Sequence, residues 1–203
     1  HTSLIRPDLL IHIGEISGDY YTWASLKPKS VWRVSKDGEL KDAFKCLDNV
    51  FHMSERFFFR HYSDLREPFP SVSGKMAGIE NEYNSVVSSV PELPFSNLWV
   101  ARSLADRLPA GSVLHLGILN SLRSWNFFRP DPTIKVFSNV GGFGIDGGMS
   151  SLLGSSLASP EILHFGVFGD LAFFYDMNSL GNRHVGKNIR ILLINNGKGT
   201  EFR

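Results

Sequence analysis

Residues 162–196 read ILHFGVFGDLAFFYDMNSLGNRHVGKNIRILLINN and predict a strand, a helix and a second strand in succession. The strands are the two apolar runs at 162–168 and 189–194, and an amphipathic segment at about 171–180 lies between them. Two parallel strands need a crossover of this kind, which is usually a helix. The stretch therefore predicts one βαβ unit of a parallel sheet.

The same alternation continues toward the N-terminus. Helices are expected at 97–108, 122–128 and 149–157, and Asn97 is placed to cap the first of them. Strands are expected at 112–118 and 133–137. This alternation predicts an α/β fold, in which a parallel sheet has helices on both faces and binds its ligands at the carboxyl ends of the strands.

The first third of the chain shows a weaker pattern, with short strand-like runs. Residues 67–78 hold two prolines, two glycines and two serines, which is typical of a linker or an exposed crossing. We therefore expect part of one α/β domain at 1–66, a linker at 67–90 and part of a second domain at 91–203.

The composition excludes several classes of protein. The 203 residues include 21 Lys and Arg and 20 Asp and Glu, so no basic surplus favours nucleic acid or an anionic membrane as a partner. The single cysteine, Cys46, fits a reducing cytoplasm. No apolar run approaches the roughly 20 residues that span a bilayer. Because the chain lacks an initiator methionine and a plausible end, we expect it to be a piece of a larger protein.

Polar residues follow the two strands of the 162–196 stretch. Gly169 and Asp170 follow the first, and Asn195 and Asn196 follow the second. A carboxylate and an amide oxygen at neighbouring strand ends can share one hard cation, with a backbone carbonyl two residues beyond as a further ligand. Mg²⁺ held by so few protein oxygens usually bridges to substrate phosphates, toward which a helix beginning at Leu171 would direct its N-terminus.

A glycine pattern favours a different ligand. Gly142, Gly144 and Gly147 form a G-x-G-x-x-G sequence between an expected strand and an expected helix, and Asp170 lies 23 residues further on. This arrangement is typical of dinucleotide-binding turns. Glycines in a tight turn can also be present only because the backbone there has a positive φ or packs closely against a neighbour. The dinucleotide interpretation gives the two asparagines no role.

The GD and NN pairs, separated by 24 residues, resemble the fingerprint of the thiamin-diphosphate-dependent decarboxylases, acetolactate synthases and related enzymes. The NS pair at 120–121, GIDG at 144–147 and GDL at 169–171 resemble one branch, the 2-succinyl-5-enolpyruvyl-6-hydroxy-3-cyclohexene-1-carboxylate synthases of menaquinone biosynthesis. The resemblance is specific from residue 98 to residue 196. Residues 1–66 look like the end of the family's central, non-catalytic, Rossmann-like domain.

The resemblance implies thiamin diphosphate and Mg²⁺ as cofactors. It implies a transferase or carboligase that decarboxylates a 2-oxo acid, 2-oxoglutarate in this branch, and passes the carbanion to an acceptor. It also implies a homodimer or homotetramer. The glutamate that activates the cofactor in the family lies in another domain and has no counterpart here, so this chain would hold no catalytic residue and would be inactive alone.

The resemblance also implies a role for individual residues. Asp170 and Asn196 would bind Mg²⁺ through their side chains, and Lys198 would bind it through its backbone carbonyl. Ile145 would support the bent cofactor, and Ser121 would line the substrate side of the pocket. The complete set of implied cofactor-binding residues is Ser121, Gly144, Ile145, Gly169, Asp170, Leu171 and Asn196.

Two positions depart from the family pattern. Val140 and Trp125 stand where the family has arginines that bind substrate carboxylates, and neither side chain can replace a bidentate guanidinium. Arg123 lies two positions from Trp125. Three interpretations therefore stay open: the family reaction with an altered pocket, a paralogue that acts on a different 2-oxo acid, and a non-catalytic dinucleotide-binding or regulatory module.

Overall fold

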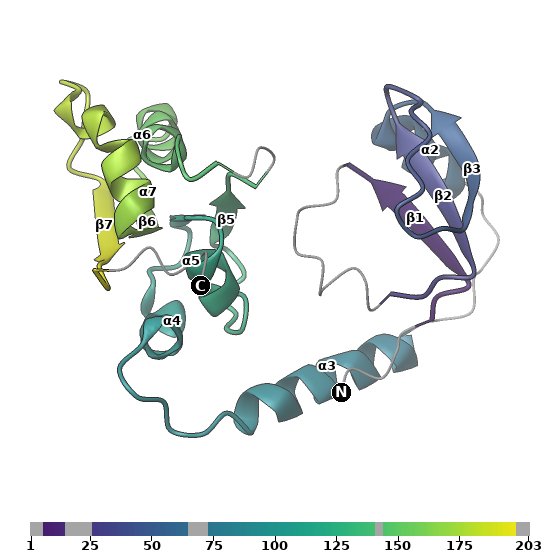
Figure 1. Cartoon of the computed structure of the whole chain (residues 1–203), viewed down its shortest axis with the longest axis horizontal. Helices are drawn as coiled ribbons and strands as arrows, with labels where there is room; N and C mark the ends of the chain where they lie inside the picture. The colour runs from purple at the N-terminus through teal and green to yellow at the C-terminus, as the bar shows by residue number, and fades with distance from the viewer. Residues whose placement is uncertain (1–5, 15–25, 65–72, 141–143, 198–203) are drawn as a thin grey trace. The chain divides into compact units, whose positions relative to one another are not determined.

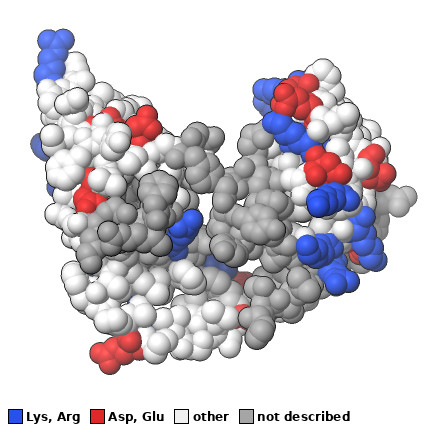
Figure 2. Space-filling model, in the orientation of Figure 1, with Lys and Arg blue, Asp and Glu red and all other residues white. Residues whose placement is uncertain are grey.

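The computed structural model describes residues 6–14, 26–64, 73–140 and 144–197 (Figure 1). The chain divides into two compact units, His1–Ser71 and Val72–Arg203, and each unit holds its own parallel sheet. Parallel strands joined by helices confirm the predicted α/β fold class. In the view of Figure 2, acidic and basic side chains are mixed over the described surface of the first unit, and the described surface of the second unit is mostly uncharged.

The first unit contains a three-stranded parallel sheet in the order β1-β2-β3, followed by one helix. Its elements are β1 (Leu9–Ile13), β2 (Ser30–Ser35), β3 (Leu47–His52) and α2 (Glu55–Ser63). Val31 and Val34 of the central strand are buried, as is Phe58 of α2. The Phe58 ring packs edge-on against Phe51 of β3, with 5.0 Å between the ring centroids, so aromatic contacts attach the helix to the sheet.

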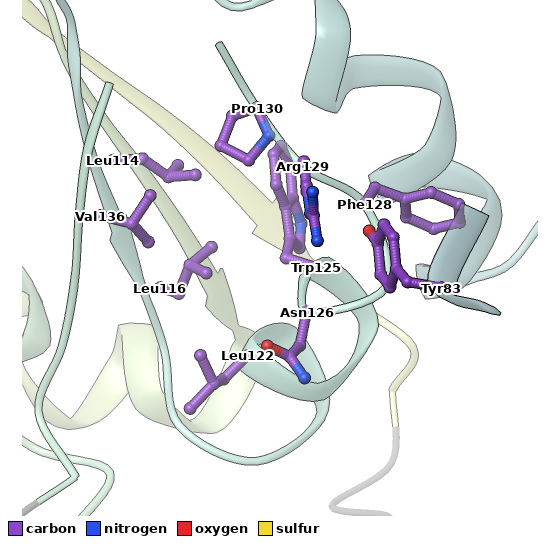
Figure 3. A pocket seen from close by; sticks show the side chains of 10 residues that line it. All are labelled: Tyr83, Leu114, Leu116, Leu122, Trp125, Asn126, Phe128, Arg129, Pro130 and Val136. Carbon is purple, nitrogen blue, oxygen red and sulfur yellow. The ribbon is translucent and has the colours of Figure 1, made fainter. Parts of the chain in front are cut away.

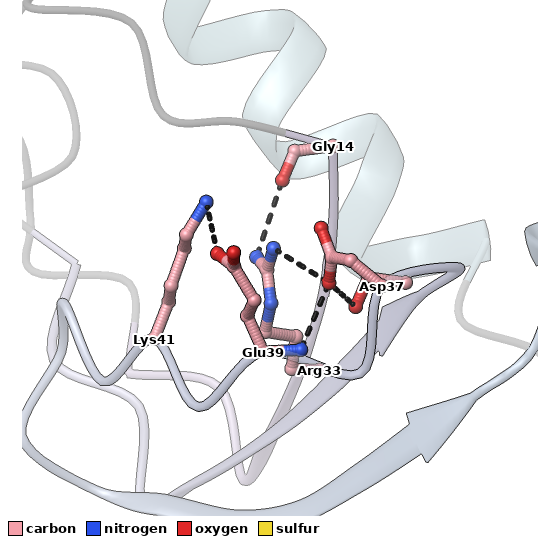
Figure 4. A network of polar contacts seen from close by, with 6 residues as sticks. Gly14, Arg33, Asp37, Glu39 and Lys41 are labelled. Carbon is pink, nitrogen blue, oxygen red and sulfur yellow. Dashed lines mark hydrogen bonds and ion pairs between the residues drawn. The ribbon is translucent and has the colours of Figure 1, made fainter.

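A network of polar contacts links the carboxyl ends of β1 and β2 (Figure 4). The Arg33 side chain, only 1% exposed, donates from Nη1 to the carbonyl of Gly14 at 3.3 Å, and its Nη2 lies 3.9 Å from Asp37 Oδ1. Asp37 also accepts the Glu39 N–H at 2.9 Å and the Ser35 hydroxyl at 2.7 Å. These contacts, first the Glu39 N–H, lower the pKa of Asp37. The buried guanidinium therefore has a structural role in this unit.

The second unit is built on a four-stranded parallel sheet in the order β5-β4-β6-β7. Its strands are β4 (Val113–Leu116), β5 (Lys135–Ser138), β6 (His164–Gly169) and β7 (Ile189–Ile194). Its helices are α3 (Ser73–Ser88), α4 (Asn97–Leu104), α5 (Asn120–Trp125), α6 (Gly148–Ala158) and α7 (Asp170–Tyr175), with short 3₁₀ turns η1 (Ala105–Arg107) and η2 (Met177–Gly181).

Helices cover both faces of this sheet, because side chains alternate between the faces along each strand (Figure 1). On one face, Leu114 and Leu116 of β4 pack in a core with α4 and α5. On the other face, Phe168 of β6 packs with Met149 and Leu152 of α6. The prediction of a parallel sheet with two covered faces is confirmed for the second unit.

The strand order creates a switch point between β4 and β6. The loop after β4 leads to α5 on one face of the sheet, whereas the loop after β6 leads to α7 on the other face. The two strands stay hydrogen-bonded up to the point where their loops diverge, because the N–H of Gly117 donates to the carbonyl of Val167 at 2.8 Å. Open α/β sheets bind ligands in the crevice that such diverging loops leave at the carboxyl edge.

Residues 73–88, within the segment expected to be a linker, form helix α3. The Tyr83 hydroxyl donates to the carbonyl of Phe127 at 3.0 Å, and the Arg129 guanidinium lies 4.2 Å from the centroid of the Tyr83 ring. Arg129 also forms an ion pair with Glu80 at 2.9 Å. Helix α3 is therefore attached to the segment between α5 and β5. None of the described helices is long and apolar enough to cross a bilayer.

Candidate functional site

Two of the three residues expected to bind Mg²⁺, Asp170 and Asn196, lie at the ends of neighbouring strands. The register pairs Gly169 of β6 with Ile194 of β7, so Asp170 directly follows one strand and Asn196 is the second residue after the other. Asp170 is half-buried and Asn196 is exposed. Lys198, the third expected ligand, lies outside the described residues. The structure thus brings the carboxylate and the amide to one edge of the sheet.

Local hydrogen bonds shape the backbone around both residues. One oxygen of Asp170, Oδ1, accepts the N–H of Leu171 at 2.9 Å. Beyond β7, Oδ1 of Asn195 accepts the N–H of Gly197 at 3.0 Å, and Gly197 adopts a φ of +62°. An asparagine followed two positions later by a glycine in the left-handed region makes a tight turn. The turn begins directly after the strand and includes Asn196.

The donor set suits a hard cation. Mg²⁺ prefers oxygen ligands, keeps several waters and is commonly held by one or two carboxylates together with substrate phosphates. Asp170 and Asn196 provide one carboxylate and one amide oxygen for such an ion. Within the described ranges, no three His, Cys, Asp or Glu side chains cluster in a way that would hold a metal by themselves. A cation at this edge therefore needs ligands from a bound phosphate, water or a backbone carbonyl.

The loop after β4 contributes the third part of the edge. Ser121 lies in the first turn of α5 and is only 5% exposed. Leu119, directly before the helix, has φ +69° and ψ −119°. This region is rare for a leucine and costs on the order of 1–3 kcal/mol, and such residues cluster at functional sites. No sequence signal predicts this conformation, so Leu119 is a feature that sequence analysis missed.

The loop between β5 and α6 contributes Gly144 and Ile145, and Ile145 is half-buried. Asn139, just beyond β5, donates from Nδ2 to the carbonyl of Gly147 at 3.0 Å and to Oγ of Ser151 at 2.9 Å. The first residue after Ser138 is therefore held against the start of α6. Asn139 was also missed by the sequence analysis, because the motif alone does not show where its side chain points.

The end of the glycine pattern has a structural explanation. Gly147 has a φ of +76° at the start of α6, a conformation that glycine adopts without strain. A Cβ on the following Gly148 would lie 2.8 Å from the Phe168 ring, so a side chain there would collide with β6. Gly142, the first glycine of the pattern, lies outside the described residues. The φ of Gly147 therefore explains the last glycine of the pattern without a dinucleotide, and the contact with Phe168 explains the neighbouring Gly148, which is outside the pattern.

The two positions that depart from the family pattern lie in different surroundings. Trp125 is 4% exposed and packs in the core between α5 and the sheet, together with Leu114 and Leu116. Val140 is half-buried, and its N–H donates to the carbonyl of Ser138 at 3.1 Å, close to the carboxyl end of β5. The indole is therefore a packing group, and Val140 is the departure that lies nearer the edge.

A cavity of about 480 Å³ lies on the α5 face of the sheet (Figure 3). Its wall is mainly apolar and aromatic, and it includes none of the residues predicted for the site. It is lined by Tyr83, Leu114, Leu116, Leu122, Trp125, Asn126, Phe128, Arg129, Pro130 and Val136. The cavity is thus distinct from the edge that carries Asp170 and Asn196.

Taken together, the fold and the edge define the second unit as a doubly wound α/β protein with oxygen donors for a hard cation at its strand ends. No protein-family model matches the chain. The chain is 36% identical over 178 residues to the 2-succinyl-5-enolpyruvyl-6-hydroxy-3-cyclohexene-1-carboxylate synthase of Bacteroides fragilis. It is 35% identical over 175 residues to that of Phocaeicola vulgatus and 31% identical over 204 residues to that of Desulfotalea psychrophila.

These matches cover 86%, 86% and 99% of this chain, respectively. They cover 31%, 30% and 36% of the relatives, so the chain spans about a third of the length of the curated relatives that it matches. The similarity confirms the resemblance drawn from the motifs: the chain is similar to these synthases over most of its length.

Proposed function

We propose that the second unit holds the diphosphate of thiamin diphosphate and its Mg²⁺ in a thiamin-diphosphate-dependent transferase. The complete protein decarboxylates a 2-oxo acid and transfers the resulting carbanion to an acceptor. The observation that carries this proposal is the placement of Asp170 and Asn196 at neighbouring strand ends, beside the switch point of the sheet. The identity with synthases of this class over nearly the whole chain supports it.

The proposal gives each part of the edge a task. Asp170, Asn196 and the carbonyl of Lys198 bind Mg²⁺, and the backbone at 169–171 lies beside the diphosphate. Residues 144–145 support the rest of the cofactor, and Ser121 lies toward the substrate. When bound, thiamin diphosphate supplies the electron sink for the carbanion, while these residues bind and orient it.

The substrates of the complete protein follow from the same relationship. We propose a 2-oxo acid donor, with 2-oxoglutarate and isochorismate as the pair to assay for the family reaction of menaquinone biosynthesis. Val140 lacks the charge that would bind a substrate carboxylate, which supports a paralogue for another 2-oxo acid as the second candidate. Activity of the full-length enzyme with 2-oxoglutarate and isochorismate would exclude the paralogue.

The complete protein is further proposed to be a cytoplasmic homo-oligomer. In the family, the glutamate that activates the cofactor usually comes from a neighbouring subunit, so the complete site needs a second copy. Light scattering of the full-length protein would measure its mass in solution. A monomer that retains full activity would contradict this part of the proposal.

Calorimetry tests the cofactor site in this chain. We expect thiamin diphosphate to bind with Mg²⁺ present and to lose its binding heat in excess EDTA. Asp170→Ala should weaken binding at least about tenfold, since even residues that only support metal ligands have effects of this size. Glu161→Gln changes an exposed carboxylate near the amino end of β6 and should bind like the wild type.

Two outcomes would contradict the proposed function. The first is equal binding with and without Mg²⁺, and the second is unchanged binding by Asp170→Ala. A thermal-shift comparison separates the dinucleotide alternative. Protection of the chain by NAD but not by thiamin diphosphate would favour the binding-module interpretation.

A further inference from the structure

We infer that Asp176 is a positioning residue for the proposed cofactor site, because its carboxylate holds the start of helix α6 from outside that helix. Its Oδ2 accepts the backbone N–H of Ser150 at 2.6 Å, and its Oδ1 accepts the Ser150 hydroxyl at 2.7 Å. The two residues lie 26 positions apart in the sequence. The inference rests on the proposed function and adds a residue to which that function assigns no role.

Helix α6 needs this partner, because it has no cap of its own. Its N-cap residue is Gly147, which has no side chain, and its first turn contains no acidic residue. The first N–H groups of a helix lack intrahelical acceptors and carry partial positive charge. Asp176 provides both an acceptor and a negative charge, and hydrogen bonds to an ionised group are among the stronger ones in proteins.

Asp176 is itself fixed at the junction between α7 and η2. Its backbone carbonyl accepts the N–H of Ser179 at 3.1 Å and the Ser179 hydroxyl at 2.8 Å. Helix α7 begins at Asp170, the proposed Mg²⁺ ligand, and is only six residues long. One short helix therefore has the proposed metal ligand at its first residue and the carboxylate that holds α6 directly after its last.

The segment held by Asp176 is the one that leads from Ile145 into α6. Asn139 already binds the carbonyl of Gly147 from the side of β5. Asp176 binds the same helix start from the side of α7, so the end of the loop is fixed from two directions. In this way the hydrogen bonds between Asp176 and Ser150 join the helix that begins at Asp170 to the helix that follows Ile145.

The test compares two variants that each remove hydrogen bonds from α6. Asp176→Asn removes the charge and places an amide NH₂ beside the donors of Ser150. Asn188→Ala is the matched control, because Asn188 donates to the carbonyls of Ser156 and Ile162 at 3.1 Å each, near the opposite end of the helix. We expect both variants to unfold at a lower temperature, and only Asp176→Asn to weaken Mg²⁺-dependent thiamin diphosphate binding, by about tenfold.

Amide hydrogen exchange of the cofactor-free chain provides a second readout that needs no ligand. Asp176→Asn should accelerate exchange in residues 144–150, whereas Asn188→Ala should leave these amides unchanged. If the wild-type chain does not bind thiamin diphosphate, the proposed function fails, and the exchange data still decide whether Asp176 holds this loop. Equal losses of affinity in both variants, or unchanged exchange at 144–150 in Asp176→Asn, would overturn the inference.

Discussion

His115 of β4 and His164 of β6 lie on neighbouring strands and on the same face of the sheet, the face that α6 covers. His164 is held by Oγ of Ser155 and the carbonyl of Ser159, each 3.2 Å from one of its ring nitrogens. His115 is 7% exposed and packs against the Phe137 ring. Burial, and then the proximity of His164, lower the pKa of His115 below its ordinary value of 6.5.

A lowered histidine pKa makes the second unit less stable in acid. Below about pH 6.5 the unfolded chain binds a proton that folded His115 resists, so the free energy of unfolding should fall as the pH decreases toward the folded-state pKa. A difference of one bound proton between the unfolded and folded states changes the free energy of unfolding by at most about 1.4 kcal/mol per pH unit. Urea unfolding at pH 7.5 and pH 5.5 would measure the difference. In His115→Gln, the difference in unfolding free energy between the two pH values should be smaller. An unchanged difference would show that His115 is not the group responsible.

The Asp37 network should make the first unit sensitive to stronger acid. Because the pKa of Asp37 is lowered, its stabilisation is complete above its ordinary value of 3.8 and is lost as the pH falls through the lower folded-state pKa. Asp37→Asn should therefore lower the stability at pH 7 and reduce the loss of stability between pH 4 and pH 2. Amide hydrogen exchange in β2 would follow the unfolding of the first unit. Asp64→Asn, at an exposed carboxylate just after α2, is the control and should retain the wild-type profile.

The attachment of α3 should depend more on Tyr83 than on the ion pair. Arg129→Ala removes both the cation–π contact and the pair with Glu80, which together correspond to about 1 kcal/mol at exposed sites. Glu80→Gln removes only the pair and should cost less than about 0.5 kcal/mol. Chemical unfolding of both variants would measure the two effects. Equal losses would show that the stacking contributes nothing.

The backbone strain at Leu119 predicts that a glycine variant is more stable than a valine variant. Leu119→Gly relieves the positive φ and should leave the stability within about 0.5 kcal/mol of the wild type or increase it. Leu119→Val should destabilise by about 1–2 kcal/mol, because a β-branched residue tolerates this region poorly. Thermal unfolding would rank the variants. A valine variant as stable as the glycine variant would show that the loop is not strained.

Much of the second unit follows from its sequence, because each buried parallel strand is a short apolar run that ends near a glycine or a turn. The expected helix at 97–108 corresponds to α4 and η1, and the expected helix at 171–180 corresponds to α7 and η2. The expected cap was wrong by one residue: Ser96, and not Asn97, accepts the N–H of Trp99 at 3.2 Å. Helix boundaries depend on single hydrogen bonds that a hydrophobic pattern does not contain.

Other features depend on contacts between distant residues and were not predictable. The order β5-β4-β6-β7 depends on which strands pair, and the polar, glycine-bearing sequence of α3 gives little sign of a helix. The resemblance placed Trp125 at a substrate-binding position, whereas packing against β4 places its indole in the core. The contact of Asp176 with Ser150 was also missed, because a motif read along the chain does not show which helix end a carboxylate will reach.

The strand order also determines when the candidate site can form during folding. β4, α5 and β5 are neighbours in both sequence and space, so they can assemble from local contacts. β6 must cross the sheet by way of α6 to reach the other side of β4, and such distant pairings form slowly. The edge that carries Asp170 therefore does not exist until this crossing is complete. A chain that ended before residue 164 would keep half of the sheet and neither Asp170 nor Asn196, the two side chains proposed to bind the cation.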